Sequence, residues 1–377
     1  MKIAIKTLAI ILVSIIVLSA FLGSCNDGGE MSDFVFKETS IAVGRNLIMR
    51  VTEDGHIAMR GRIEVPGRET LYFPEFAIIN NITDVYALSE TAIARNEQFV
   101  IKTDGSVWEM KPAEKPSDGN YFAFTKVDGI GNCIKICVGA GHVIALTNDG
   151  TVWTWGRNDC GQLGNGTRLD STSPQMIKGL SSIVDITAGG FHCLALDVDG
   201  YAYSWGDNTY GQLGNGKSLI DRLLGNDDKA IPRKIRGLKG VRQIAAGDSV
   251  SIALLGNGTV RQWGIEEHGY FPPTSATRPK RVKGLDGIVA ISASGNMALA
   301  LTKEGHVWQW GYLNNFIIND GDPNPPEMVG GLPKSIIVAT GYVTSISVAE
   351  DGTIWLWGVD RTAVGITQYI QPPIMIR

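Results

Sequence analysis

The side chains that could support acid–base or metal chemistry are few and widely spaced. The five histidines are His56, His142, His192, His268 and His306. No two of them stand at the spacing of metal ligands, and the sequence has no serine-hydrolase, zinc-protease or phosphate-loop motif. His142 and His192 occupy the same position of an internal repeat, so we expect both to be structural hydrogen-bonding residues. The sequence therefore predicts a protein that is not an enzyme and that holds no metal and no cofactor.

Acidic residues recur directly before a glycine, at Asp54, Asp104, Asp149, Asp199 and Asp351. We interpret them as turn residues, because Asp-Gly suits the positive φ angles of a tight hairpin. Calcium binding by these acids is the alternative. A propeller enzyme such as a lyase or glycan hydrolase would need acids that converge in a pocket, and the sequence shows no such pair.

The N-terminus has the pattern of an export signal. Residues 1–6 contain two lysines, residues 7–20 are almost wholly apolar, and small residues follow. The apolar run is shorter than the roughly 20 residues that span a bilayer, although a permanent anchor helix is the alternative. Leu22-Gly23-Ser24-Cys25 resembles the bacterial lipobox. This resemblance implies cleavage before Cys25 and a lipid on its thiol, which would hold the protein on a membrane of the bacterial cell envelope, outside the cytoplasm. An unmodified or disulfide-bonded Cys25 is the other possibility.

Four cysteines follow Cys25. Cys133 and Cys137 would lie about 13 Å apart in an extended strand, whereas a disulfide needs Cα atoms within about 7 Å. They can bond only if the segment is bent, which Cys-Ile-Lys-Ile-Cys does not favour. Cys193 stands where the preceding repeat has Val143, so we expect a buried thiol.

The chain contains seven copies of one repeat. Its clearest copy is Asp149-Gly150-Thr151-Val152-Trp153-Thr154-Trp155-Gly156. The turn glycines of the seven copies are Gly55, Gly105, Gly150, Gly200, Gly258, Gly305 and Gly352. Eleven residues before each of them the residue is small, and four residues before each of them it is aliphatic. This spacing of about 50 residues is typical of propeller blades.

We therefore predict an all-β fold, a seven-bladed β-propeller over residues 40–377. Residues 1–24 are expected to be a lipoprotein signal peptide and residues 25–39 a polar tether. The small residues suit inner strands that approach one another closely. The tryptophans are interpreted as packing between blades rather than as ligand-stacking residues.

Two copies carry an additional loop with a distinctive sequence. It reads Asn-Asp-Cys-Gly-Gln-Leu-Gly-Asn-Gly at residues 158–166 and Asn-Thr-Tyr-Gly-Gln-Leu-Gly-Asn-Gly at residues 208–216. With Ala140-Gly141-His142, Asp149-Gly150 and Trp155-Gly156, this loop resembles the regulator of chromosome condensation (RCC1-like) repeat family. The other five copies lack the loop and match only in their strands and turns.

The resemblance implies a propeller whose known members act by binding. Eukaryotic members are exchange factors for a small GTPase and bind chromatin, and a secreted bacterial branch binds and inhibits β-lactamases. This chain departs from the eukaryotic pattern because it carries an export signal and has no basic tail. Its formal net charge of −4 also argues against nucleic-acid binding, which requires a basic surface.

We therefore expect a scaffold that binds a protein or another macromolecule through its loops. Aromatic residues in the longest departures from the repeat are the candidate partner-binding residues: Tyr210, Tyr270, Phe271, Tyr312 and Phe316. Packing of these rings against their own blades is the alternative. A GTPase regulator and a propeller enzyme acting on envelope glycans are the other functional hypotheses.

The two ends of the ring must meet somewhere. Pro373-Ile374-Met375-Ile376 repeats the register of Pro174-Gln175-Met176-Ile177, the last strand of an internal copy. We expect residues 371–377 to lie near residues 34–44 and to complete either the same blade or the seam beside it.

Overall fold

The computed structural model describes residues 41–43, 47–63, 70–91, 98–117, 120–217, 229–265, 275–295, 297–311, 324–341, 344–360 and 368–376. The chain divides into two units, Met1–Thr39 and Ser40–Arg377. The predicted signal peptide and tether, including Cys25, lie outside the described residues. Among the described residues there is no helix that could cross a membrane.

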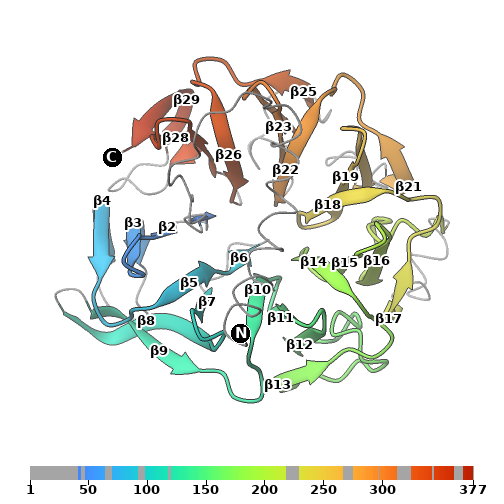
Figure 1. Ribbon diagram of the computed structural model, residues 1–377, viewed down its shortest axis with the longest axis horizontal. Helices are drawn as coiled ribbons and strands as arrows, with labels where there is room; N and C mark the ends of the chain where they lie inside the picture. Colours follow the sequence, from blue (N-terminus) through green and yellow to red (C-terminus); the bar gives the residue numbers. More distant parts are fainter. Residues whose placement is uncertain are drawn as a thin grey trace, which may run out of the picture. The chain divides into compact units, whose positions relative to one another are not determined.

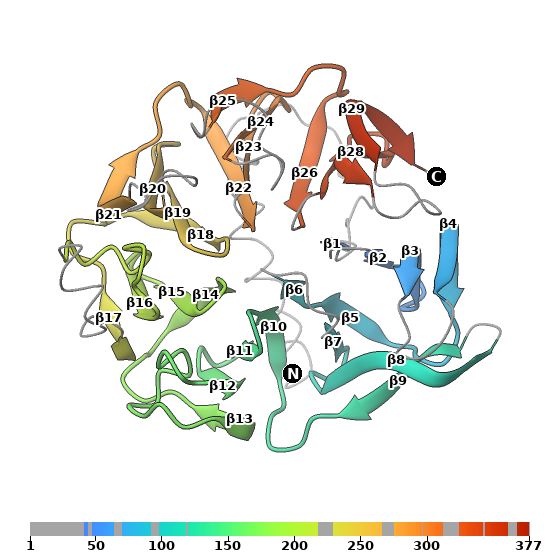
Figure 2. The same cartoon turned by 180° about the vertical axis from the view of Figure 1, so that it is seen from behind.

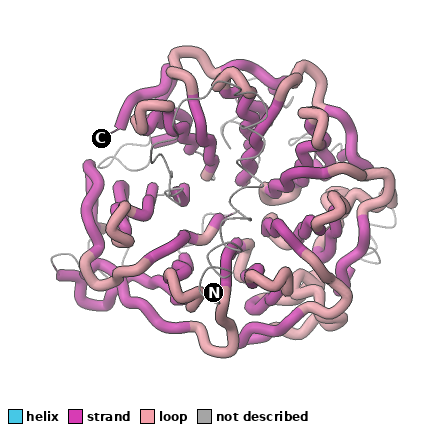
Figure 3. Tube along the Cα trace, viewed as in Figure 1, coloured by secondary structure: helices cyan, strands magenta, loops and turns pink. Residues whose placement is uncertain are grey.

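The described part of Ser40–Arg377 is all β and forms seven sheets arranged in a ring (Figure 1). The same ring is seen from behind in Figure 2, and Figure 3 shows strands and loops with no helix between them. The predicted seven-bladed β-propeller is therefore confirmed. We number the blades in chain order.

The first two blades come from the two copies that lack the Trp-Gly pair after the turn. Blade 1 consists of β1 (Ile41–Val43), β2 (Leu47–Val51), β3 (Ile57–Ile63) and β4 (Leu71–Ile79). Blade 2 consists of β5 (Val85–Leu88), β7 (Gln98–Lys102), β8 (Val107–Ser117) and β9 (Asn120–Lys126). The short β6 (Glu90–Thr91) pairs in parallel with the first strand of blade 3 and so ties blade 2 to it.

The other five blades are antiparallel meanders of four strands. Blade 3 is β10 (Cys133–Val138), β11 (His142–Thr147), β12 (Val152–Gly156) and β13 (Ser171–Met176). Blade 4 is β14 (Ile183–Ala188), β15 (His192–Asp197), β16 (Ala202–Gly206) and β17 (Lys229–Lys234). Blade 5 is β18 (Val241–Ala246), β19 (Val250–Leu255), β20 (Val260–Ile265) and β21 (Ser275–Arg281). Blade 6 is β22 (Ile288–Ser294), β23 (Met297–Thr302), β24 (Val307–Gly311) and β25 (Asn324–Met328). Blade 7 is β26 (Ser335–Thr340), β27 (Thr344–Ala349), β28 (Ile354–Asp360) and β29 (Gln368–Ile376).

The hydrophobic core lies between blades. The second strand of blade 3, β11, is buried along its whole length, as expected for a strand covered on both faces. Trp205 of blade 4 lies in a cluster with Ile144 and Leu146 of blade 3, and Trp263 of blade 5 lies in a cluster with Leu194 of blade 4. The predicted role of the tryptophans in packing between blades is therefore confirmed at these two positions.

The small residues at the ends of the inner strands are required by close backbone approaches. A Cβ added to Gly139 would lie 2.5 Å from the carbonyl oxygen of Gly189, and one added to Gly189 would lie 2.7 Å from that of Gly247. Each would also lie 2.1 Å from Cε1 of the histidine three residues later, His142 or His192. A larger residue at either glycine would therefore have to displace the neighbouring blade and the imidazole.

The ring closes by side-chain packing at the seam between blades 7 and 1. The C-terminal strand β29 is the last strand of blade 7, and β1 is the first strand of blade 1, so the two ends do not share a blade. Ile376 lies in one buried cluster with Val43 and Ile48 of blade 1. We expected the two ends either to share one blade or to meet at the seam beside it, and the described residues meet at the seam. Residues 34–40 lie outside the described residues.

Candidate partner-binding face

The two ends of the blades carry connections of different kinds. At one end each second strand turns into the third through a three-residue hairpin, such as residues 148–150, which end in Gly150, and the fourth strand leads to the next blade. At the other end lie the first-to-second and third-to-fourth connections, such as residues 139–141 and 157–170 of blade 3. We call these ends the hairpin face and the loop face.

Only the loop face varies strongly from blade to blade. The seven hairpin glycines have φ angles between +76° and +87° and therefore form nearly the same turn. By contrast, the third-to-fourth connection ranges from residues 118–119 in blade 2 to residues 207–228 in blade 4. Tyr210 falls in the third-to-fourth connection of blade 4 and therefore belongs to the loop face.

Tyr210 is the one candidate aromatic residue that the structure describes. It is half-buried and packs against the cluster that contains Val250 and Ile252 of blade 5. Tyr210 therefore braces its loop against the next blade and leaves part of its ring open to solvent. Tyr270, Phe271, Tyr312 and Phe316 lie outside the described residues.

The two Gly-Gln-Leu-Gly loops are held by side chains of their own blades. In blade 3, the Asn158 amide oxygen accepts a hydrogen bond from the Leu163 backbone N–H at 2.9 Å, and the Thr154 hydroxyl donates to the Leu163 carbonyl at 2.7 Å. In blade 4, Asn208 and Ser204 make the same bonds to Leu213, at 2.9 and 2.8 Å. These bonds fix the loop as a rigid part of the loop face.

Each of these loops also binds the next blade through an indole N–H. Trp205 donates to the carbonyl of Gln162 at 2.9 Å, and Trp263 donates to the carbonyl of Gln212 at 2.8 Å. We call this contact the inter-blade indole bond. Since both indoles are fully buried, the bond gives each N–H a hydrogen-bond partner that it would otherwise lack in the core.

Blades 5 and 6, which lack the loop, supply the acceptor from a strand. Trp310 donates to the Gln262 side chain at 2.6 Å, and Trp357 donates to the Gln309 side chain at 2.8 Å. Gln262 and Gln309 occupy the repeat position of Thr154, directly before the Trp-Gly pair. Sequence reasoning missed this substitution, although the exchange of threonine or serine for glutamine in blades 5 and 6, which both lack the loop, would have revealed it.

His142 and His192 lie beneath the loop face and are completely buried. Nε2 of His142 lies 3.2 Å from the Cys193 thiol, and Nε2 of His192 lies 2.9 Å from the Ser251 hydroxyl. Both contacts join neighbouring blades, so the predicted structural role of the two histidines is confirmed. Burial lowers the pKa of His142 to about 4 and that of His192 to about 3, which keeps both rings neutral near pH 7.

Backbone hydrogen bonds link the inner loops of the loop face from blade to blade. Ala140 donates to Gly190 at 2.8 Å, Gly190 donates to Asp248 at 3.0 Å, and Asp248 donates to Gly295 at 2.7 Å. Asp248 is the acidic member of this series. Its Oδ1 is buried and has no partner among the described residues, and burial raises the pKa of the carboxyl group to about 7.

Replacing Asp248 with asparagine is expected to stabilise the protein at pH 8 and to have little effect at pH 4. The folded-state pKa lies above the unfolded one, so Asp248 destabilises the fold progressively as the pH rises from about 4 to 7. Because the residue is partly solvated, we expect a gain on the order of 1–2 kcal/mol at pH 8. Urea unfolding of the wild type and Asp248→Asn at both pH values measures it. If the free energies of unfolding of the wild type and Asp248→Asn differ by the same amount at pH 4 and pH 8, the raised pKa of Asp248 is contradicted.

Exposed side chains of the blade 3 loop complete the described part of this face. Leu169 is 75% exposed although it is a large apolar residue. The Arg157 guanidinium lies 5.2 Å from the ring centroid of Phe191 in blade 4 and pairs with Asp159. An exposed leucine beside a cation, an anion and a half-buried ring offers both apolar contact and directional bonds to a macromolecule.

The Asp-Gly acids lie on the hairpin face and act as turn residues. The Asp149 carboxylate accepts hydrogen bonds from the Thr147 hydroxyl at 2.7 Å and the Thr151 hydroxyl at 2.8 Å. These bonds lower the pKa of Asp149. Within the described ranges, no three His, Cys, Asp or Glu side chains are grouped so that they could hold a metal ion.

The cysteines that the structure describes form no disulfide: Cys133, Cys137, Cys160 and Cys193. Cys133 and Cys137 lie in the extended strand β10, as their spacing predicted. Cys193 is completely buried, and its thiol donates to the carbonyl of Gln162 at 3.5 Å. The predicted buried thiol at Cys193 is confirmed.

Known relatives share segments of the sequence. Over 88 residues the chain is 33% identical to the RCC2 homolog protein of Danio rerio, a match that covers 21% of this chain and 18% of the relative. Over 45 residues it is 42% identical to the human E3 ubiquitin-protein ligase HERC2, covering 12% of this chain and 1% of that protein. The chain thus matches less than a fifth of the length of either relative.

Solved structures share the fold over nearly the whole chain. Yeast RCC1 (Prp20) bound to Kap60 superposes with a TM-score of 0.68 at 18% identity and covers 94% of this chain and 90% of that one. Human WBSCR16 superposes with a TM-score of 0.66 at 18% identity, covering 84% and 88%. Prp20p from Saccharomyces cerevisiae, described with its binding to Gsp1p and histones, gives 0.65 at 20% identity and covers 91% and 88%. At these identities the likeness shows the fold.

The match to a family model shows to which family the chain belongs. The model of the RCC1-like domain matches residues 39–329, which is well over half of the chain. The match contains both Gly-Gln-Leu-Gly loops and the first six turn glycines. This chain therefore belongs to the RCC1-like domain family.

Proposed function

We propose that this protein is a non-enzymatic scaffold that binds a protein partner through its loop face. The observation that carries the proposal is the contrast between the two faces: the hairpin face repeats one turn seven times, whereas the third-to-fourth connections of the loop face range from residues 118–119 in blade 2 to residues 207–228 in blade 4. Variable loops on a rigid frame are the usual place for recognition. Yeast Prp20, a solved relative in fold, was studied in complex with Kap60 and for its binding to Gsp1p and histones.

The proposal predicts that a charge introduced on the loop face weakens partner binding. Leu169 on the loop face and Val198 on the hairpin face are both exposed apolar residues, at 75% and 62% exposure. Leu169→Asp is expected to weaken partner binding by at least about tenfold, as for an interface anchor, and Val198→Asp is expected to bind like the wild type.

Partners are captured from cell-envelope fractions, identified by mass spectrometry and then purified for titration against the wild type and both variants. Equal binding by all three proteins, or loss only with Val198→Asp, would place the interface away from the loop face. Recovery of glycan without protein would contradict a protein partner.

We further propose that the protein is exported and held on a bacterial envelope membrane by a lipid on Cys25. The charged start, the apolar run of residues 7–20 and the Leu22-Gly23-Ser24-Cys25 sequence support this. Residues 25–39 would then act as a polar tether between the lipid and the propeller.

The expected result is that Cys25→Ala leaves the membrane fraction while the wild type stays in it. One acyl chain binds membranes only weakly, so stable retention requires more than one chain. Detergent partitioning measures retention on the membrane, and the intact mass of the mature protein gives the number of acyl chains. If wild type and Cys25→Ala partition alike and neither carries lipid, the anchor is disproved, but a loop-face interface is not.

A further inference from the structure

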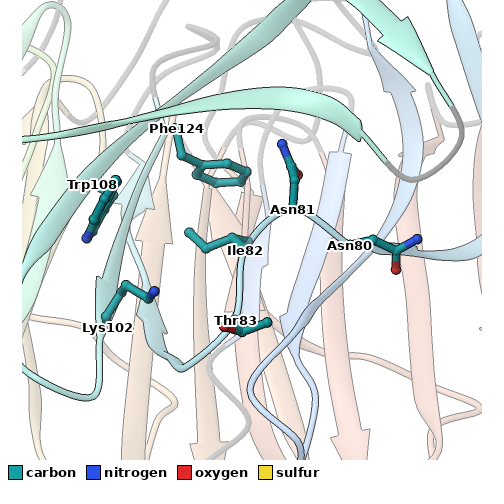
Figure 4. Close-up of a pocket in the computed structure, with 7 residues that line it drawn as sticks. All are labelled: Asn80, Asn81, Ile82, Thr83, Lys102, Trp108 and Phe124. Carbon is teal, nitrogen blue, oxygen red and sulfur yellow. The ribbon is translucent and has the colours of Figure 1, made fainter.

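A pocket of about 310 Å³ opens at the seam between blades 1 and 2, on the hairpin face. It is lined by the link between β4 and β5 and by side chains of β7, β8 and β9 (Figure 4). Its volume is at the lower end of the range for small-molecule sites. The pocket is separate from the loop face and independent of the function proposed above.

The link that forms the pocket departs from the repeat. At the position of Asn81 the other described links carry glycine with φ near +80°: Gly129, Gly179, Gly237, Gly284 and Gly331. Asn81 is not in this conformation, and its amide instead donates to the Phe122 carbonyl of blade 2 at 2.6 Å. Asn81 thus bridges the seam and holds one side of the pocket in place.

The apolar surface of the pocket is aromatic. Trp108 and Phe124 are half-buried, and both pack against the core cluster shared by blades 1 and 2. The Trp108 indole N–H is already bonded to the Ser106 hydroxyl at 2.9 Å, so Trp108 offers a ring face rather than a donor. Beneath them lies the buried side chain of Ile82 (Figure 4).

Lys102 is the one charged side chain among the residues that line the pocket, and it is paired with Asp84 nearby. The Lys102 ammonium lies 5.6 Å from the Trp108 ring centroid and 3.8 Å from an Asp84 carboxylate oxygen. The pKa of Asp104 is lowered mainly by its hydrogen bonds from Ser106 and to a smaller extent by the charges of Lys126 and Lys102. The exposed Thr83 hydroxyl donates to Asp84 at 3.0 Å and retains its acceptor capacity. Because Asp84 offsets the charge of Lys102, the pocket does not favour a phosphate or a nucleic acid.

From this arrangement we infer that the pocket binds a neutral saccharide, with one sugar ring stacked on Trp108. A pyranose ring has an apolar C–H face and a rim of hydroxyl groups. The face matches the Trp108 and Phe124 rings, and the rim matches Lys102, Thr83 and the Asn81 amide oxygen. An open pocket that covers one sugar ring is expected to bind it with a dissociation constant of about 1 mM, and longer glycans more tightly.

Saturation-transfer NMR and calorimetry test the assignment with the methyl glycosides of glucose, galactose and N-acetylglucosamine on the full chain. At least one glycoside is expected to bind, with the strongest transfer to protons on one face of the ring. Trp108→Ala should weaken binding about tenfold. Lys102→Thr, which introduces the residue found in the repeat at Thr52, Thr147 and Thr302, should weaken it about threefold.

Trp153→Ala is the matched control, because Trp153 has the same repeat position in blade 3 and donates to Thr151 in the same way, at 3.3 Å. It should bind the glycoside like the wild type. Lys102→Thr keeps the test valid if Trp108→Ala fails to fold, which melting curves will show. The inference is overturned if no glycoside binds below about 20 mM, if Trp153→Ala weakens binding as much as Trp108→Ala, or if Lys102→Thr has no effect.

Discussion

Replacement of Trp205 with alanine is expected to lower the free energy of unfolding by about 4 kcal/mol. Trp205 is completely buried between blades 3 and 4, so its removal leaves a large cavity in the cluster that contains Ile144 and Leu146. It also removes the inter-blade indole bond to Gln162. Urea unfolding with fluorescence and circular dichroism measures the change.

Two further variants separate packing from hydrogen bonding at this site. Trp205→Phe keeps most of the buried ring and removes the N–H donor, so we expect a loss of about 1–2 kcal/mol. Trp153→Ala, at the half-buried position two residues before the Trp of blade 3, should cost less than Trp205→Ala. A cost below about 1 kcal/mol for Trp205→Ala would show that the ring is not core and would contradict the packing described here.

Acid is expected to unfold the protein through its two buried histidines. An unfolded histidine titrates near pH 6.5, whereas burial lowers the folded pKa of His142 to about 4 and that of His192 to about 3. Below pH 6.5 these two histidines therefore bind protons in the unfolded chain but not in the folded protein, so the free energy of unfolding falls as the pH falls. Each ring should account for a loss on the order of 3 kcal/mol between pH 7 and pH 4, a large part of the stability of a typical domain.

The pH dependence of His192→Met isolates one of these contributions. Methionine is the residue at the corresponding position of blade 6, Met297, so this substitution suits the fold. The variant should lose less stability than the wild type between pH 7 and pH 4, by on the order of 3 kcal/mol. The exposed His306 provides the control: His306→Gln should follow the wild-type curve. Parallel curves for His192→Met and the wild type would mean that His192 is not buried as a neutral ring.

The inter-blade indole bond recurs along blades 3 to 7, although its acceptor changes. In blades 3 and 4 the backbone carbonyl of the loop accepts the bond, and in blades 5 and 6 the side chain of Gln262 or Gln309 accepts it. At the seam between blades 1 and 2 neither partner exists, because Met110 stands where other copies have the tryptophan and Met59 where they have the acceptor. The donor and the acceptor are lost together, so no buried polar atom is left unpaired there.

The sequence by itself determined the fold of this protein. Strand order, blade number and hairpin turns follow from local rules, because a tight turn that ends in Asp-Gly and a buried apolar strand need no distant partner to be recognised. The repeat makes each of these signals appear seven times. For the same reason, the structural roles of His142, His192 and Cys193 could be predicted from their repeat positions.

Only the tertiary structure decided which residues meet across the seams. Trp310 and Gln262 are far apart in the sequence, and no local pattern pairs an indole with an amide one blade away. The half-buried state of Tyr210, the unpaired Oδ1 of Asp248 and the aromatic pocket beside Asn81 likewise arise from contacts between neighbouring blades. These features depend on the angle and the distance between neighbouring sheets. Packing sets both for the ring as a whole, and the spacing of residues along one blade does not encode them.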